Sequence, residues 1–318
     1  MRALHVTTFD MPATLIDVPV TPPTEGEVLL RIKACGLNFA DLLMAKGTYQ
    51  DTPIPPFTLG MEVCGTVLAQ GAGVKTPAIG ARVAVFGGQG GLADQGVFPA
   101  ELCREVPDIM TSEVAAGFQV AYGTSHLALT RRAKLQAGET LLVLGAAGGV
   151  GLTAVEIGKV MGATVIGVAR GAEKMAVAKT AGADYVIDSN DDITETVRAL
   201  GGADVVYDPV GGATFMAALR ATKREGRVIV IGFASGDIPQ IPANYVLVKN
   251  ITVMGFYWGG YLKFNPNALK DSVGELLDWY VQGHLKPHIS HIMPLSKVAD
   301  ALELLRSRES TGKIVVTQ

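Results

Sequence analysis

The chain has 318 residues, of which 48% are hydrophobic and 18% charged, and its formal net charge is −3 at pH 7. This length accommodates two domains, and the acidic balance gives no basic patch of the kind that binds nucleic acid. No run of about 18 apolar residues predicts a membrane span, and the first residues read as a strand rather than a signal peptide. Three widely spaced cysteines, Cys35, Cys64 and Cys103, are typical of a reducing compartment, so we expect a cytoplasmic protein.

The first part of the chain, residues 1–115, consists of short apolar runs separated by glycine and proline turns. Strands are predicted at 27–34, 63–69, 82–86 and 96–99. We interpret this part as a compact, glycine-rich β domain.

The pattern changes after a helix start at 111–113, and strands then alternate with helices. The predicted strands are 140–144, 164–169, 185–187, 204–208, 227–232 and 251–255. The predicted helices are 114–129, 149–161, 173–181, 193–200, 213–221, 267–282 and 295–306. A last strand at 313–316 is expected to return to the first domain. This alternation predicts an α/β fold with a doubly wound, Rossmann-type parallel sheet.

A glycine-rich turn, Gly145–Gly151, lies between a predicted strand and a predicted helix. Backbone N–H groups at a helix start bind a pyrophosphate where no Cβ blocks its approach. We therefore predict a dinucleotide site in which Gly148, Gly149 and Val150 contact the pyrophosphate and ribose. An ordinary strand-to-helix turn of a parallel sheet is the alternative.

The next strand ends without the acidic residue that commonly binds the ribose 2′-hydroxyl of NAD. Arg170 stands there instead, and Lys174 follows one helical turn later. Two cations suit a 2′-phosphate, so the predicted cofactor is NADPH. In the alternative interpretation both are solvated residues at a helix start, with Glu173 between them reducing the local positive charge.

Five segments carry a family pattern, and they are 34–41, 56–62, 122–124, 145–151 and 312–316. Together they resemble the medium-chain dehydrogenase/reductase superfamily, and within it the zinc-independent quinone oxidoreductases that include zeta-crystallin. The resemblance extends over essentially the whole chain.

This resemblance implies a GroES-like, β-rich catalytic domain and a Rossmann domain with a cleft between them. Its N-terminal part is expected at 1–115, the NADP-binding domain at 116–256, and a C-terminal part at 257–318 that returns to the catalytic domain. The family also implies a homodimer in which strands near 246–256 pair across the interface.

Zinc-dependent members carry a cysteine where this chain has Asn38 and a histidine where it has Met61. An amide and a thioether do not replace a thiolate and an imidazole as zinc ligands, so no metal is predicted. Asp41, which belongs to the same family segment, is expected to act as a helix cap or in an ion pair rather than in catalysis.

The family positions imply two catalytic residues, Asn38 and Tyr49. Asn38 would lie near the nicotinamide and donate its amide to a quinone oxygen, and the Tyr49 phenol would orient or protonate the substrate. Phe233 and Phe256 match positions beside the nicotinamide, and Arg308 matches an arginine near the adenosine phosphate. For each residue a structural role stays open: a turn for Asn38, packing for the aromatic residues and solvation for Arg308.

The chain departs from many relatives after its third Rossmann strand. Ser189 stands where those relatives carry a tyrosine that covers the 2′-phosphate, and Asp188 precedes it. A serine still hydrogen-bonds a phosphate, but Asp188 would repel a 2′-phosphate or bind a free ribose. Use of NADH beside NADPH therefore stays open.

The leading hypothesis is an NADPH-dependent reductase that transfers a hydride to a small-molecule quinone in the interdomain cleft. The enzyme alternative is an enone or 2-enoyl reductase, for which a pocket acid, Tyr49 or Asp41, would be essential. The non-enzyme alternative is a nucleotide-binding structural or RNA-binding protein, which the acidic charge disfavours.

Overall fold

The computed structural model describes residues 1–318, and the chain forms two compact units. The first unit comprises residues 1–120 and 288–318, and the second comprises residues 121–287. The chain therefore returns to the first unit at residue 288, whereas the sequence-based boundary stands at residue 257.

Helix α10 (Pro266–Val281) accounts for this later return, because it packs within the second unit. The His126 Nδ1 atom lies 2.8 Å from Ser272 Oγ on α10, and the His126 ring meets the Trp279 ring edge-on at 5.2 Å. Only after this helix does the chain add strands to the sheet of the first unit.

The second unit contains a six-stranded sheet in which every neighbouring pair of strands is parallel. The order of the strands across the sheet is β11-β10-β9-β12-β13-β14. Their bounds are β9 (Thr140–Leu144), β10 (Thr164–Ala169), β11 (Tyr185–Asp188), β12 (Ala203–Asp208), β13 (Thr222–Val230) and β14 (Thr252–Gly255). This order is that of a dinucleotide-binding doubly wound sheet, and it confirms the predicted fold class.

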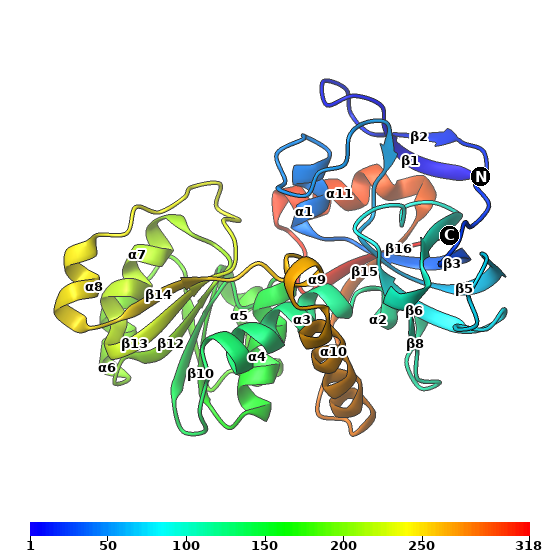
Figure 1. The fold of residues 1–318 in the computed structure, drawn as a ribbon. Coiled ribbons are helices and arrows are strands. Elements are labelled where there is room, and N and C mark those ends of the chain that lie inside the picture. The colour runs from blue at the N-terminus through cyan, green and yellow to red at the C-terminus, as the bar shows by residue number, and fades with distance from the viewer. The chain divides into compact units, whose positions relative to one another are not determined.

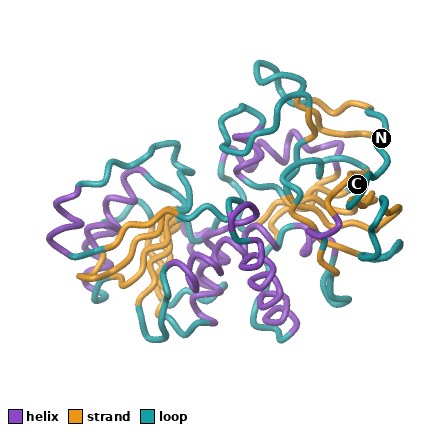
Figure 2. Tube along the Cα trace, viewed as in Figure 1, coloured by secondary structure: helices purple, strands orange, loops and turns teal.

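Helices cover both faces of this sheet (Figures 1 and 2). The helices between residues 119 and 264 have the bounds α3 (Gln119–Leu127), α4 (Gly149–Val160), α5 (Gly171–Thr180), α6 (Ile193–Ala199), α7 (Gly212–Ala221), α8 (Ala243–Lys249) and α9 (Tyr261–Phe264), of which α9 packs on α10. Leu142, Leu144 and Val206 point to the face covered by α6 and α7, where they pack with Ile193 and Phe215. The alternate residues of β9 are equally buried, which is why this strand is apolar throughout.

The first unit contains more strand than helix, with long loops between the strands, as Figure 2 shows. Its larger sheet has the order β15-β16-β3-β5-β6-β8, with β7 also pairing with β3, and its smaller sheet is β2-β1-β4. The strand bounds are β1 (Arg2–Val6), β2 (Thr14–Asp17), β3 (Glu27–Gly36), β4 (Phe57–Thr58), β5 (Glu62–Gln70), β6 (Arg82–Phe86), β7 (Gln95–Pro99), β8 (Arg104–Glu105), β15 (Ile289–Pro294) and β16 (Lys313–Thr317). The helix bounds are α1 (Phe39–Met44), α2 (Ser112–Ala116) and α11 (Val298–Ser307), with short 3-10 turns at Ala100–Leu102 and Leu295–Lys297.

The helix predicted at 114–129 is divided into two. Thr111 caps the first part, since its Oγ1 accepts from Val114 N at 3.3 Å, and this part ends at Gly117. The second part, α3, begins where Val120 N donates to Glu62 Oε2 at 3.0 Å and continues as a π-helical turn, Ala128–Arg132. A carboxylate from a distant strand thus sets the start of α3, which local periodicity does not show.

The segment 246–256, implied to be strand, is strand only in part. Helix α8 occupies its beginning and ends at Asn250, whose φ of 52° is left-handed. Strand β14 then forms the edge of the sheet with β13 as its neighbour. The implied strand is therefore confined to residues 252–255.

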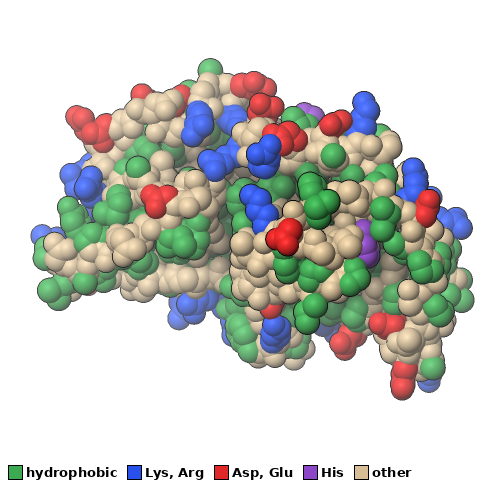
Figure 3. Space-filling view, turned by 90° about the horizontal axis from the view of Figure 1, so that it is seen from above, with side chains coloured by type: hydrophobic (Ala, Val, Ile, Leu, Met, Phe, Trp, Pro, Cys, Tyr) green, Lys and Arg blue, Asp and Glu red, His purple; other side chains and the backbone are tan.

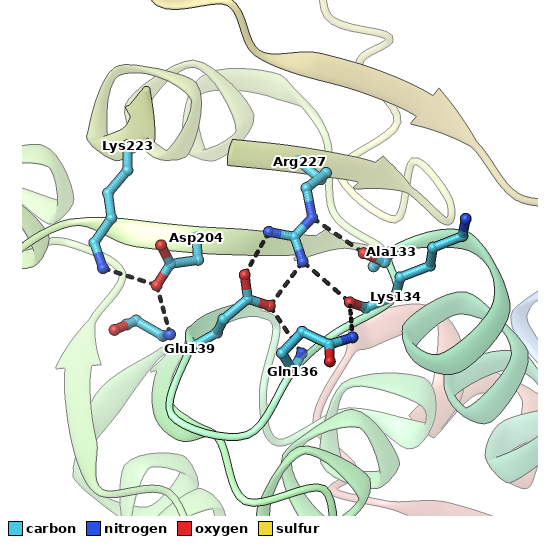
Figure 4. A network of polar contacts seen from close by, with 8 residues as sticks. Ala133, Lys134, Gln136, Glu139, Asp204, Lys223 and Arg227 are labelled. Atoms are coloured by element: carbon cyan, nitrogen blue, oxygen red, sulfur yellow. Dashed lines mark hydrogen bonds and ion pairs between the residues drawn. The ribbon is translucent and has the colours of Figure 1, made fainter. Parts of the chain in front are cut away.

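A network of charged side chains fastens the amino ends of the central strands (Figure 4). Arg227 forms two hydrogen bonds of 2.7 Å with the two carboxylate oxygens of Glu139, and its Nε donates to Ala133 O at 3.0 Å. Asp204 Oδ2 accepts from Lys223 Nζ at 2.7 Å and from Thr140 N at 2.8 Å. The hydrogen bonds from Arg227 are the largest cause of the lowered pKa of Glu139.

We expect Arg227→Met to lower the free energy of unfolding by about 1.5–3 kcal/mol, because the mostly buried Glu139 carboxylate loses its charged partner. A carboxyl group whose pKa is lower in the folded than in the unfolded protein stabilises the fold at any pH above its unfolded-state pKa. This stabilisation is lost as the pH falls through the folded-state pKa. Urea titrations at pH 7 and below pH 4.5 should therefore show the effect of the variant shrinking in acid. Arg306→Met, which breaks the exposed pair with Glu303, is the control and should cost less than about 1 kcal/mol. Equal losses in the two variants would contradict this role of Arg227.

Candidate active site

Most of the predicted cofactor residues lie at one edge of the second unit. Because parallel strands end at the same edge of a sheet, the segments that follow them lie together there (Figure 1). The residues in these segments are Gly148, Gly149 and Val150 after β9, Arg170 and Lys174 after β10, Ser189 after β11, Phe233 after β13 and Phe256 after β14.

The glycine turn leaves open space at the start of α4. A Cβ added to Gly148 would meet only Gly145 O, at 3.4 Å, and no side chain caps the helix. A Cβ on Gly151 would lie 2.1 Å from the same carbonyl oxygen, so glycine there lets the helix pack against the turn. The uncapped amides of the first helical turn fit the pyrophosphate of a dinucleotide.

A buried chain of hydroxyl groups holds this helical turn from behind. Ser125 Oγ donates to Val150 O at 2.9 Å and lies 2.8 Å from Thr153 Oγ1 and 2.9 Å from the Tyr207 hydroxyl. Thr153 Oγ1 also lies within hydrogen-bond distance of Ala121 O, at 3.0 Å. These contacts tie α4 to α3 and β12. Sequence reasoning missed them, since a serine, a threonine and a tyrosine at separate core positions give no signal that their hydroxyl groups meet.

Asp208 is a further residue of this edge that the sequence did not reveal. It is fully buried at the end of β12, where Oδ1 accepts from Val210 N at 2.7 Å and from Gly211 N at 2.9 Å. Burial is the largest cause of its raised pKa. These hydrogen bonds hold the loop that follows β12. This loop lies against the glycine turn, since a Cβ on Gly145 would lie 2.9 Å from Val210 Cγ2.

The segments after β10 and β11 bring charges of both signs together. Arg170 precedes α5 as an exposed N-cap residue, and Lys174 is half-buried. Asp188 Oδ2 accepts from Gly171 N at 2.9 Å, and Oδ1 accepts from Asn190 N at 2.9 Å. The hydrogen bond from Asn190 is the largest cause of the lowered pKa of Asp188. Half-buried Ser189 follows at once, with its N–H donating to Ala169 O at 3.0 Å.

In the first unit, Asn38 is held by three side-chain contacts. Its Nδ2 donates to Glu62 Oε1 at 3.0 Å and to Gly36 O at 3.3 Å, and its Oδ1 accepts from Lys313 Nζ at 2.8 Å. Since Lys313 has only donors, it fixes which way the amide points. Both amide hydrogens have acceptors, so donation to a substrate would require one of these bonds to break.

Lys313 is the centre of this cluster. Its Nζ donates to Leu37 O at 2.6 Å, to Asn38 Oδ1 at 2.8 Å and to Glu62 Oε1 at 2.8 Å, which satisfies all three ammonium hydrogens. The side chains of Lys313 and Glu62 are only 9% and 2% exposed. Lys313 lies in one of the five family segments, and the lone lysine before an apolar strand was a usable sequence signal for a role that only the structure reveals.

Asp41 acts as a cap, as expected. Its Oδ2 accepts from Asn38 N at 2.8 Å at the start of α1, and its side chain is fully buried. Burial is the largest cause that raises the pKa of Asp41, to about 7.

The predicted aromatic residues and Arg308 are divided between the two units. Tyr49 is half-buried in the loop between α1 and β4, and Arg308 is exposed at the end of α11 with a left-handed φ of 58°. Phe233 is 37% exposed after β13, whereas Phe256 is buried with its ring 5.6 Å from that of Tyr261. Tyr49 and Arg308 belong to the first unit and the two phenylalanines to the second.

The donor set around Asn38 does not fit a catalytic zinc. Asn38 offers an amide whose atoms are already bonded, and buried Met61 offers a thioether. Nowhere in the chain do three His, Cys, Asp or Glu side chains gather as a metal site would need. None of the helices is long and apolar enough to cross a membrane.

We expect Lys313→Met to lower the free energy of unfolding by about 3–5 kcal/mol, because it leaves the buried Glu62 carboxylate without its partner. The double variant Lys313→Met/Glu62→Gln removes both charges and keeps an acceptor for Val120 N. Urea unfolding followed by circular dichroism should show that the double variant regains at least half of the loss. A double variant no more stable than Lys313→Met would show that the cost does not come from the unpaired charge.

Comparisons with known proteins agree with both units. Residues 24–108 match the alcohol dehydrogenase GroES-like domain family, and residues 149–278 match the zinc-binding dehydrogenase family. The chain is 40% identical over 298 residues to quinone oxidoreductase-like protein 2 homolog of Nematostella vectensis, covering 92% of this chain and 81% of that one. It is 37% identical to quinone oxidoreductase-like protein 2 of Bos taurus over 321 residues, which are 99% of this chain and 92% of the relative.

Among solved structures, the quinone oxidoreductase of Thermus thermophilus, also solved in complex with NADPH, is 33% identical and superposes with a TM-score of 0.89 over the full length of both chains. The five family segments found in the sequence and these similarities agree. The chain belongs to the medium-chain dehydrogenase/reductase superfamily, among its quinone oxidoreductase-like members.

Proposed function

We propose that this oxidoreductase uses NADPH to reduce quinones without a metal ion. The observation that carries the proposal is the open turn at Gly148, where the uncapped start of α4 offers amides to a pyrophosphate. Arg170, directly after the neighbouring strand, and Lys174, in the first turn of α5, supply the cations that a 2′-phosphate needs. The Thermus relative, which was solved with NADPH, supports the same cofactor.

When bound, NADPH would supply a hydride, and a quinone takes up this hydride and one proton to become a hydroquinone. The residues of this chain bind and orient the reactants. The amides of Gly149 and Val150 would hold the pyrophosphate, and Phe233 and Phe256 would lie beside the nicotinamide. Arg308 would contact the adenosine phosphate.

Asn38 and Tyr49 are the proposed catalytic residues. The buried cluster fixes the orientation of the Asn38 amide. To donate a hydrogen bond to the reacting ring, Asn38 Nδ2 would have to release Gly36 O, which is the more distant of its two acceptors. The Tyr49 hydroxyl is the proposed proton donor. A quinone is electron-poor enough to need little help from an acid, which suits a site without a metal ion.

The alternatives predict different observations. An enone reductase must protonate carbon, so an acid such as Tyr49 or Asp41 would be essential. A nucleic-acid-binding role would need a continuous basic surface, but on the face drawn in Figure 3 acidic side chains lie among the basic ones.

The decisive experiment measures NADPH oxidation by the chelator-treated protein with 1,4-benzoquinone and with a matched simple enone. We expect fast turnover of the quinone and slow turnover of the enone. The control is Gly148→Val, whose backbone φ of −81° suits valine but whose side chain would fill the cofactor space. It should fold normally and lose at least about 100-fold in NADPH affinity, since a misplaced pyrophosphate removes several charged hydrogen bonds. Turnover of the enone alone would move the assignment to C=C reduction and make Tyr49→Phe inactive.

We also propose that the chain forms a homodimer through the free edge of β14. An unpaired edge strand is a template for pairing with a second copy, and exposed apolar residues of α8, Leu247 and Val248, lie close to it in sequence. Sedimentation equilibrium should give twice the mass of one chain, and Leu247→Asp should weaken the association. A chain that stays monomeric at about 100 µM would contradict the proposal, because association rises with protomer concentration.

A further inference from the structure

Asp188 lies directly beside the segment that would receive the 2′ end of the cofactor. Strands β10 and β11 are parallel, and Ala169 is in register with Asp188. Arg170 follows Ala169 directly, so it lies one residue past the position that pairs with Asp188. The carboxylate of Asp188 also accepts from Gly171 N, the first residue of α5, at 2.9 Å.

The Asp188 carboxylate is held in place by several donors. Asn190 donates to Oδ1 from both its backbone N and its Nδ2, each at 2.9 Å, while Gly171 N donates to Oδ2. These contacts leave the side chain little freedom to swing away from an approaching anion. A negative charge fixed in this way acts on its surroundings without reorganising.

The charged residues that follow β10 and β11 form one corner of the second unit, beside the expected 2′ end of the cofactor, and their formal charges cancel. Arg170 and Lys174 contribute two positive charges, and Glu173 and Asp188 contribute two negative ones. A 2′-phosphate carries close to two negative charges at neutral pH, so it gains little from a corner whose net charge is zero. A free 2′-hydroxyl is not repelled and can donate a hydrogen bond to a carboxylate.

We propose that Asp188 sets the cofactor choice of this protein, and that its fixed charge makes the site accept NADH as well as NADPH. This inference rests on the proposed function for its nucleotide site but not on the quinone substrate. Of the two acidic residues, Asp188 is the one whose carboxylate is held by hydrogen bonds from Gly171 and Asn190, whereas Glu173 is an exposed residue of α5.

The test compares the dissociation constants of NADPH and NADH by isothermal titration calorimetry, so no turnover is needed. Wild-type protein should bind the two nucleotides within about tenfold of each other, which corresponds to about 1.4 kcal/mol or less. Asp188→Asn should tighten NADPH binding by roughly fivefold and leave NADH binding unchanged or weaker. The gain should shrink at high salt, since the lost repulsion is electrostatic.

Two further variants make the outcome specific. Asp188→Ser is a second neutral replacement with a shorter polar side chain, and it should act like Asp188→Asn. Asp271→Asn removes the same charge from an exposed position on α10 and should change neither constant. Thermal melts of all three variants would show whether they fold.

The results separate this inference from the proposed function. Wild-type preference for NADPH by more than about 100-fold, or an unchanged ratio in Asp188→Asn, would overturn the role of Asp188. Binding of both nucleotides without quinone turnover would overturn only the proposed substrate. A protein that binds neither nucleotide would overturn both.

Discussion

A six-stranded sheet with all strands parallel is the constraint on which the second unit depends. Such a sheet is covered on both faces, so its strands must be apolar along their length and polar groups are confined to its two ends. At the amino end, Arg227 and Glu139 fasten the strands to one another. At the carboxyl end, the same geometry gathers the turns after the strands and leaves the amides of α4 without a cap. The charged pair that stabilises the sheet and the amides proposed to bind the cofactor thus lie at opposite ends of one sheet.

In the first unit a buried ammonium has the organising role. Lys313 comes from the last strand, yet its three acceptors lie in the loop after β3 and at the start of β5. Glu62, its partner, also receives the first amide contact of α3 through Val120. Because a buried charge is costly unless it is paired, this cluster tolerates few rearrangements. It therefore holds Asn38 in one orientation, and any contact that Asn38 makes with a substrate has to compete with bonds already formed.

Local patterns predicted most of the second unit. The bounds predicted for β9 and β10 match the structure, and α4 ends one residue before its predicted end. These elements depend on their own apolar runs and on the glycine turn, which are visible in the sequence. The break between α2 and α3 was missed because it depends on Glu62, more than fifty residues away. The late return at residue 288 depends on α10 packing against His126, and periodicity shows that α10 is amphipathic without showing which unit it covers.

The candidate site shows the same division between local and tertiary information. The glycine turn and Arg170 could be found from residue type and spacing, because the cofactor chemistry requires them at fixed distances from a strand end. Asp208 could not, since a buried carboxyl at a strand end becomes recognisable only when its backbone donors are known. For Asp188 the residue type alone left repulsion of a phosphate and binding of a ribose equally open. Strand register and the backbone N–H donors of two turns fix its carboxylate beside Arg170, and the effect of that charge on a cofactor follows from its fixed position rather than from its identity.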